Sequence, residues 1–241
     1  MQAPKLSIGA EIRASAAVLR IGKGMMWTLV AGPYALLALV TAGLVLPQTR
    51  RLFLWTLAEN HPVEMLTFAA LMAGGILGWV RARHAIQRRE GPLVFGFFMA
   101  VGLGLVVVAM EEIAWAQSLF SYATPEFLKA NEQGEATLHN LPGLQGHSEI
   151  MRLVFGLGSL AGIGLALVPA VRPISVPILL LPLFLLITLH ASADVINDFL
   201  ALGERLDYLM QRLSELIEMY IGGGAVAYMW LNLRAMRLSP T

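Results

Sequence analysis

Long apolar runs separated by short polar segments dominate the chain. Six of them approach the roughly 20 residues that a helix needs to cross the hydrocarbon core of a bilayer. They cover residues 25–46, 63–80, 93–110, 151–171, 174–193 and 217–233. Prolines lie at the ends of several runs, as expected for a residue that interrupts helical hydrogen bonding. The pattern predicts an all-α, polytopic bundle of about six transmembrane helices, a single integral membrane domain over residues 1–241.

Composition supports this fold class and excludes several kinds of site. The chain is 57% apolar and 14% charged, and its mean hydropathy is +0.67. It contains no cysteine, which excludes disulfides, thiolate metal sites and cysteine nucleophiles. The first run follows four basic residues, as in a signal peptide, but its length of about 22 residues exceeds a cleavable apolar region. We therefore expect a retained anchor.

Charge is distributed unequally between the two sides that six spans define. The N-terminus, residues 81–91, the turn at Arg172 and the C-terminal tail carry 11 of the 17 basic residues. The other side carries 14 of the 16 acids. Because basic loops stay in the cytoplasm, the distribution predicts that both termini are cytoplasmic and that the acidic face is outside. We expect a multi-pass protein of a bacterial inner membrane, with membrane lipids as partners and no nucleic acid.

Two longer segments lie on the predicted outer side. Residues 113–149 form a loop that is longer than a structureless connection usually is, and a helix start is predicted at Thr124-Pro125-Glu126. Residues 203–216 repeat apolar positions at helical spacing, which predicts an amphipathic helix along the membrane interface before the last span.

Polar residues at the predicted outer ends of the spans form short helical stripes. His190, Asp194, Asn197 and Asp198 recur at i, i+4, i+7 and i+8, which keeps them on one helical face. Counting about 1.5 Å per residue places His190 roughly 6 Å below the outer boundary. A second stripe precedes the last span, and a third forms if the third helix continues outward. These two stripes are Gln211, Glu215 and Glu218, and Glu111, Trp115 and Ser118.

The adjacent acids Glu111 and Glu112 end the third apolar run. Neighbouring residues on a helix point about 100° apart, so we expect at least one carboxylate to face the bundle. The candidate catalytic residues are Glu111, Glu112, His139, His190 and Asp194. The candidate supporting residues are Trp115, Gln117, Gln133, Glu135, Asn140, Asn197, Glu215 and Glu218.

Two chemistries suit such a set of residues. Imidazole and carboxylate groups are the usual ligands of a divalent cation where thiolates are absent, and a bound cation activates water. The predicted ligands are Glu112, His139, His190, Asp194 and Asp198. Without a metal, crowded carboxylates keep one member protonated as an acid beside an ionised base. The sequence contains no HExxH, GxSxG or GxxxxGK[ST] motif, so no motif distinguishes the two chemistries or identifies a reaction.

The run EEIAWAQSLFSYATPEFLKANEQGEATLHN, residues 111–140, resembles an uncharacterised family of bacterial integral membrane proteins. The pattern of that family is EEISWGQR, then TPE, then NxQGExNLHN. The chain's departures from that pattern include Ala114, Ala116 and Ser118. The resemblance strengthens the candidate site and implies no activity.

The chain is also similar, more weakly, to the CAAX-protease and bacteriocin-processing intramembrane peptidases. Their motifs are EExxxR, FxxxH and HxxxN or HxxxD. Glu111-Glu112 and His190 with Asp194 match two of these motifs in part, but Ala116 replaces the arginine and no FxxxH lies within a span.

Three functional hypotheses follow. The first is a membrane-embedded hydrolase or group transferase that acts on a lipid, lipid-linked or peptide substrate at the outer interface. The second is a non-catalytic accessory subunit or assembly factor, which docks other membrane-protein subunits through residues 113–149. The third is a transporter, which the scarcity of ionisable residues deeper than His190 disfavours.

Overall fold

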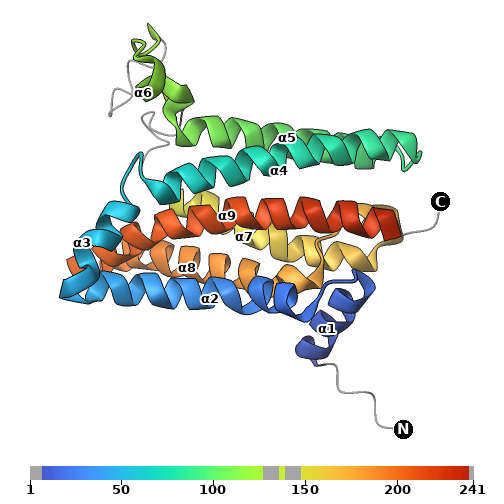
Figure 1. Ribbon diagram of the computed structural model, residues 1–241, viewed down its shortest axis with the longest axis horizontal. Coiled ribbons are helices and arrows are strands. Elements are labelled where there is room, and N and C mark those ends of the chain that lie inside the picture. Colours follow the sequence, from blue (N-terminus) through green and yellow to red (C-terminus); the bar gives the residue numbers. More distant parts are fainter. Residues whose placement is uncertain (1–6, 127–135, 139–147, 239–241) are drawn as a thin grey trace.

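Helices make up all the regular structure in the part of the chain that the computed structural model describes, which is residues 7–126, 136–138 and 148–238 (Figure 1). The longer helices are α1 (Ile8–Val18), α2 (Lys23–Val45), α3 (Pro47–Thr56), α4 (Pro62–Gln87), α5 (Pro92–Glu112), α7 (Ser148–Gly164), α8 (Leu181–Leu200) and α9 (Glu204–Leu238). The short helices are η1 (Ala114–Ala116), α6 (Gln117–Phe120), η3 (Leu165–Leu167), η4 (Pro169–Ile174) and η5 (Ile178–Leu180). The predicted all-α bundle is confirmed.

Five helical segments are long and apolar enough to cross a membrane, so the chain is a multi-pass membrane protein. They are Lys23–Val45, Pro62–Gln87, Pro92–Glu112, Ser148–Leu167 and Ile178–Leu200, and each overlaps one of the first five predicted spans. Prolines begin α3, α4 and α5, where the missing N–H of proline costs no helical hydrogen bond.

The sixth predicted span, residues 217–233, lies within α9. This 35-residue helix packs against α2, α4, α7 and α8 and runs alongside them (Figure 1). It is not among the five apolar segments because it carries more polar residues than they do, including Glu218, Asn232 and Arg234. Residues 204–216, expected along the interface, form the first part of the same continuous helix.

Small residues allow α4, α5 and α9 to approach one another closely. A Cβ atom added to Gly75 of α4 would lie 2.6 Å from the Val106 side chain and 2.8 Å from the carbonyl oxygen of Gly102 on α5. One added to Gly222 of α9 would lie 3.1 Å from the Ala70 side chain. Such contacts are the usual means by which membrane helices associate, because lipid provides no hydrophobic driving force between them.

The two ends of the bundle differ in their charged residues. Helix α1, the C-terminal end of α9 and the α4–α5 connection lie at one end, which we call the basic end (Figure 1). Here Arg81 is buried, pairs with Glu90, and lies over the Phe98 ring. Arg234 donates to the carbonyl oxygens of Leu19 and Arg20 and so ties α1 to α9.

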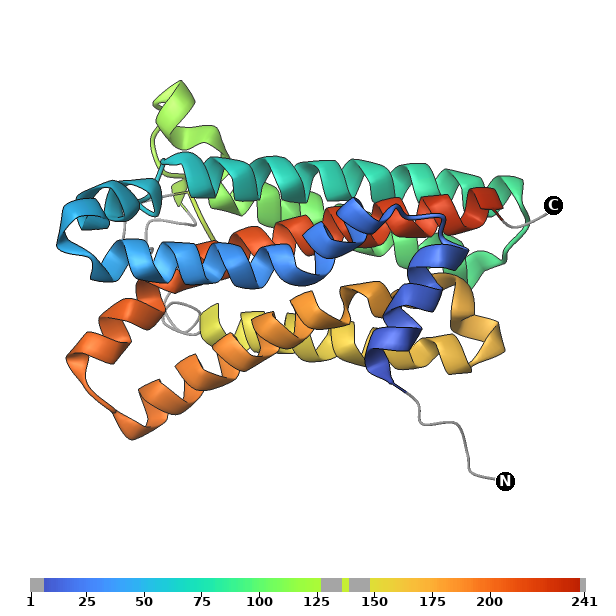
Figure 2. The same cartoon turned by 60° about the horizontal axis from the view of Figure 1, so that its bottom comes forward.

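The opposite end, which we call the acidic end, carries α3, α6 and the hairpin formed by α8 and the start of α9 (Figure 2). Glu64, in the first turn of α4, and Glu112, the last residue of α5, also lie at this end. The fold therefore gathers residues from distant parts of the sequence at this end, where α4 packs against both α5 and α9, and α8 packs against α9.

Candidate functional site

Helix α5 ends at Glu112 because the chain then adopts left-handed backbone conformations. Ala114, Trp115 and Ala116 have φ angles of 44°, 53° and 64°, which non-glycine residues seldom adopt. The stripe of Glu111, Trp115 and Ser118 was expected only if the third helix continued outward, and this condition is not met because α5 ends at Glu112. Consecutive left-handed residues are costly and persist only where the surroundings hold them in place.

Glu111 helps to hold this turn. One carboxylate oxygen accepts a hydrogen bond of 2.5 Å from Trp115 Nε1, and the other accepts one of 2.7 Å from the backbone N–H of Leu138. The side chain thus joins α5 to the far part of the 113–149 loop. Because both carboxylate oxygens make structural hydrogen bonds, Glu111 is a weaker candidate for an acid or base than Glu112.

Gln117 makes a second set of contacts within the same loop. Its Nε2 donates to Thr124 Oγ1 at 3.1 Å and its Oε1 accepts from the backbone N–H of Ala136 at 2.6 Å. The predicted supporting role of Gln117 is thus structural. The candidates Gln133, Glu135, His139 and Asn140 lie outside the described residues.

Glu112 faces the bundle and belongs to a group of carboxyl groups from three helices. The side chain is half-buried and interacts electrostatically with Glu64 of α4 and with Glu215 and Glu218 of α9. We call these four residues the carboxyl cluster. Close packing of α4 against both α5 and α9 brings them together.

The surroundings of the cluster favour protonated carboxyl groups. Glu215 lies outside the apolar spans, just before the sixth, and burial raises its pKa from 4.5 to about 8. Burial is the largest cause of this rise in pKa; the negative charges of Glu218, Glu64 and Glu59 also contribute to it, and Arg152 opposes it. At neutral pH the Glu215 carboxyl is therefore a source of protons next to Glu112.

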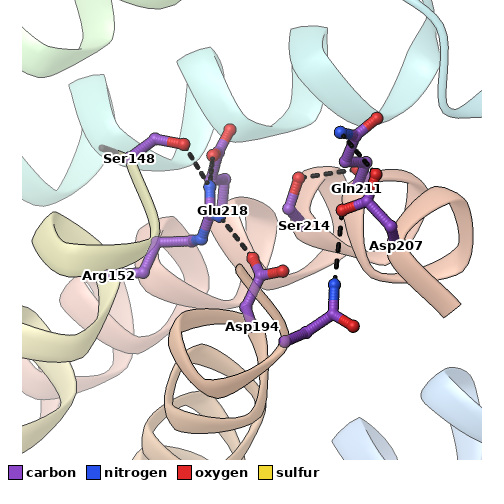
Figure 3. Close-up of polar contacts among 8 residues, drawn as sticks. Ser148, Arg152, Asp194, Asp207, Gln211, Ser214 and Glu218 are labelled. Carbon is purple, nitrogen blue, oxygen red and sulfur yellow. Dashed lines mark hydrogen bonds and ion pairs between the residues drawn. The ribbon is translucent and has the colours of Figure 1, made fainter. Parts of the chain in front are cut away.

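Arg152 of α7 is the functional residue that sequence reasoning missed. It is 6% exposed and bridges two acidic side chains of other helices (Figure 3). Its Nη2 donates to Asp194 Oδ2 of α8 at 2.9 Å, and its Nη1 donates to Glu218 Oε1 of α9 at 2.7 Å and to Ser148 Oγ at 3.0 Å. The signal available in the sequence was a lone arginine at the acidic end of an apolar run, level with many acids.

Helix α8 presents a buried polar face toward this arginine. His190, Asp194 and Asn197 are buried, as their common stripe predicts, whereas Asp198 is exposed. Asn197 Nδ2 donates to Asp207 Oδ1 of α9 at 3.3 Å, and Gln211 donates to the same carboxylate (Figure 3). Neither ring nitrogen of His190 has a hydrogen-bond partner among the described residues.

The predicted metal site is not assembled by the described residues. No group of three or more His, Asp or Glu side chains that could hold a metal ion occurs within residues 7–126, 136–138 and 148–238. Asp194 is paired with Arg152, and Asp198 lies on the exposed side of α8. His139 lies outside the described residues. The described arrangement suits proton transfer between carboxyl groups better than metal coordination.

A surface hollow lies beside the polar face of α8. It has a volume of about 320 Å³ and is located at the α8–α9 connection. Its lining comprises Asn197, Asp198, Ala201, Gly203, Glu204 and Asp207. Asn197 thus belongs both to the hollow and to the buried stripe.

Comparison of the chain with protein-family models, with curated proteins and with solved structures found no match.

Proposed function

We propose that this chain is a membrane-embedded hydrolase or group transferase that works by acid–base catalysis. Its substrate is a lipid, a lipid-linked molecule or a peptide that reaches the acidic end of the bundle. The single observation that supports this proposal is the half-buried carboxyl cluster around Glu112. The basic end faces the cytoplasm of a bacterium, as the excess of basic residues favours, and the cluster faces the outer side of the inner membrane.

The cluster supplies the two groups that such a reaction requires. Crowded carboxyl groups cannot all ionise, so a protonated one remains beside an ionised one near neutral pH. The protonated group donates to a leaving group, and the ionised group accepts a proton from the attacking hydroxyl, each contributing about 10²- to 10⁴-fold in rate. Glu112 is assigned the acid–base role because Glu111 is occupied by Trp115 and Leu138.

Arg152 of α7 positions the acidic side chains of this site. Its guanidinium fixes Glu218 of the cluster and Asp194 of α8 in one network. Removing a proton from the cluster leaves a negative charge that the neighbouring cation stabilises, which eases proton exchange. His190 lies one helical turn from Asp194 on the same helix and completes the set of ionisable groups.

Replacement of Glu112 by Gln tests the proposal because it removes the ionisable proton and nearly preserves the volume. Purified protein in nanodiscs is incubated with a total bacterial lipid extract and a peptide library, and products are identified by mass spectrometry. We expect Glu112→Gln to retain the wild-type melting temperature and to lose at least about 10²-fold in product formation. Glu11→Gln, an exposed carboxylate at the basic end, is the matched control and stays active. Wild-type activity in Glu112→Gln would contradict the assignment.

A further inference from the structure

Most of the buried polar atoms that lack a partner are concentrated in one place. Six buried side-chain nitrogen and oxygen atoms in the described residues have no hydrogen-bond partner in the protein. Four of them are His190 Nδ1, His190 Nε2, Arg152 Nε and Asn197 Oδ1. The three residues are 8%, 6% and 2% exposed, respectively, so bulk solvent does not satisfy these atoms. Buried polar groups in proteins normally find a partner, often an ordered water.

The residues that carry these four atoms lie along one face of α8 or are bonded to it. His190, Asp194 and Asn197 occupy positions i, i+4 and i+7 of α8 and therefore share one face, about 10 Å long. Arg152 joins this face through its bond to Asp194. At the outer end of the face, Asn197 lines the hollow at the α8–α9 connection. The hollow therefore lies at the Asn197 end of this face.

The chemistry of the four atoms identifies the ligand. Arg152 Nε is a donor, Asn197 Oδ1 is an acceptor, and the imidazole offers one of each when neutral. An anion is disfavoured by Asp194 and Glu218, and a cation is disfavoured by the Arg152 guanidinium between them. Water is neutral, donates and accepts, and is small enough for such a position.

We propose that His190, Asn197 and Arg152 bind a file of water molecules that enters from the hollow beside Asn197 and reaches His190. Through Arg152 and Glu218 this file ends beside the carboxyl cluster. If the proposed function holds, water is therefore the acceptor at the site, and the enzyme is a hydrolase and not a transferase. The binding of water itself does not depend on that function.

Radiolytic hydroxyl-radical footprinting of the intact protein in nanodiscs tests the water file, with bound water as the probe. After correction for intrinsic reactivity, we expect oxidation of His190 about threefold or more above that of Met229, which is fully buried in α9 among apolar residues. Asn197→Leu, which closes the entrance, reduces oxidation at His190 toward the level of Met229. Ser192→Ala, on the same helix with a hydroxyl that donates to the Thr188 carbonyl, leaves it unchanged.

The outcomes separate this inference from the proposed function. Protection of His190 equal to that of Met229 in the wild-type protein overturns the water file, whether or not Asn197→Leu folds. Retained activity in Glu112→Gln overturns the acid–base assignment and leaves the footprint unaffected. Turnover in ¹⁸O-labelled water decides the acceptor: ¹⁸O in the product supports hydrolysis, and product without ¹⁸O overturns it.

Discussion

Arg152 carries its positive charge between two carboxylates inside the acidic end. Its bonds to Asp194 and Glu218 join α7, α8 and α9. A buried ion pair adds little net stability compared with apolar residues, because both charges lose their hydration. Removal of one partner is costly, however, because it leaves the other charge buried and unpaired. The arginine therefore determines whether Asp194 can remain ionised in place.

We expect Arg152→Met, which keeps much of the side-chain volume, to lower the free energy of unfolding by about 3–5 kcal/mol. The loss arises mainly from Asp194, which is 4% exposed and loses its partner. Denaturant unfolding in detergent, followed by circular dichroism, measures the change. The double variant Arg152→Met with Asp194→Asn should recover part of it, since the buried carboxylate is then absent. Equal stability of Arg152→Met and wild type would show that the pair does not hold these helices.

Glu215 makes stability depend on pH in a defined direction. Its pKa in the folded protein is about 8, against an ordinary value of 4.5, so the folded state binds more protons than the unfolded state between these limits. The free energy of unfolding therefore falls as pH rises from about 4.5 to 8 and is level above that range. We expect the melting temperature of Glu215→Gln to match wild type below pH 4.5 and to exceed it most above pH 8.

Thermal unfolding in one detergent across this pH range measures the difference between the two proteins. Glu11→Gln, which replaces an exposed carboxylate at the opposite end, serves as the control and should follow the wild-type curve. A constant difference between Glu215→Gln and wild type at all pH values would mean that the residue acts through packing and not through its proton.

Among the elements, the α4–α5 pair depends on the absence of side chains at its contact. Gly75 packs directly against Val106 and the backbone of Gly102. We expect Gly75→Ala to lower the free energy of unfolding by about 1–3 kcal/mol, because overpacking displaces the neighbouring helix. Gly96→Ala is the matched control on α5: nothing lies within 4 Å of the added Cβ, so it should be neutral or stabilising. Equal losses in both variants would contradict the close approach.

Among the elements, the sequence predicted the helical spans whose formation depends on the length and polarity of a single segment. The first five spans were recovered because each is a continuous apolar run between polar residues or prolines. The turn at residues 114–116 was not, because alanines and a tryptophan adopt left-handed angles there without a glycine or proline to indicate it. The roles of Arg152 and of Glu64 beside Glu112 depend on contacts between helices distant in sequence, which periodicity does not encode.

The whole molecule has a charge polarity, with a basic end and an acidic end, and this polarity relates its topology to its proposed chemistry. Arg81 and Arg234 stabilise the basic end through Glu90 and the carbonyl oxygens of Leu19 and Arg20. The carboxyl cluster and the hollow lie at the acidic end. Arg152 lies there with Asp194 and Glu218 (Figure 3). Since basic segments remain cytoplasmic, this polarity predicts that the cluster is reached from outside the membrane.

A chain without cysteine allows a direct test of this orientation, because each introduced thiol is the only one present. Ser121→Cys reports on the acidic end, whereas Gln87→Cys and Arg237→Cys report on the basic end, and all three positions are exposed. On intact bacterial spheroplasts, we expect a membrane-impermeant maleimide to label only Ser121→Cys. Gln87→Cys and Arg237→Cys should become labelled after permeabilisation. Labelling of Arg237→Cys in intact spheroplasts would place the end of α9 outside the cell and exclude a sixth span. Labelling of Gln87→Cys but not of Ser121→Cys in intact spheroplasts would place the carboxyl cluster in the cytoplasm.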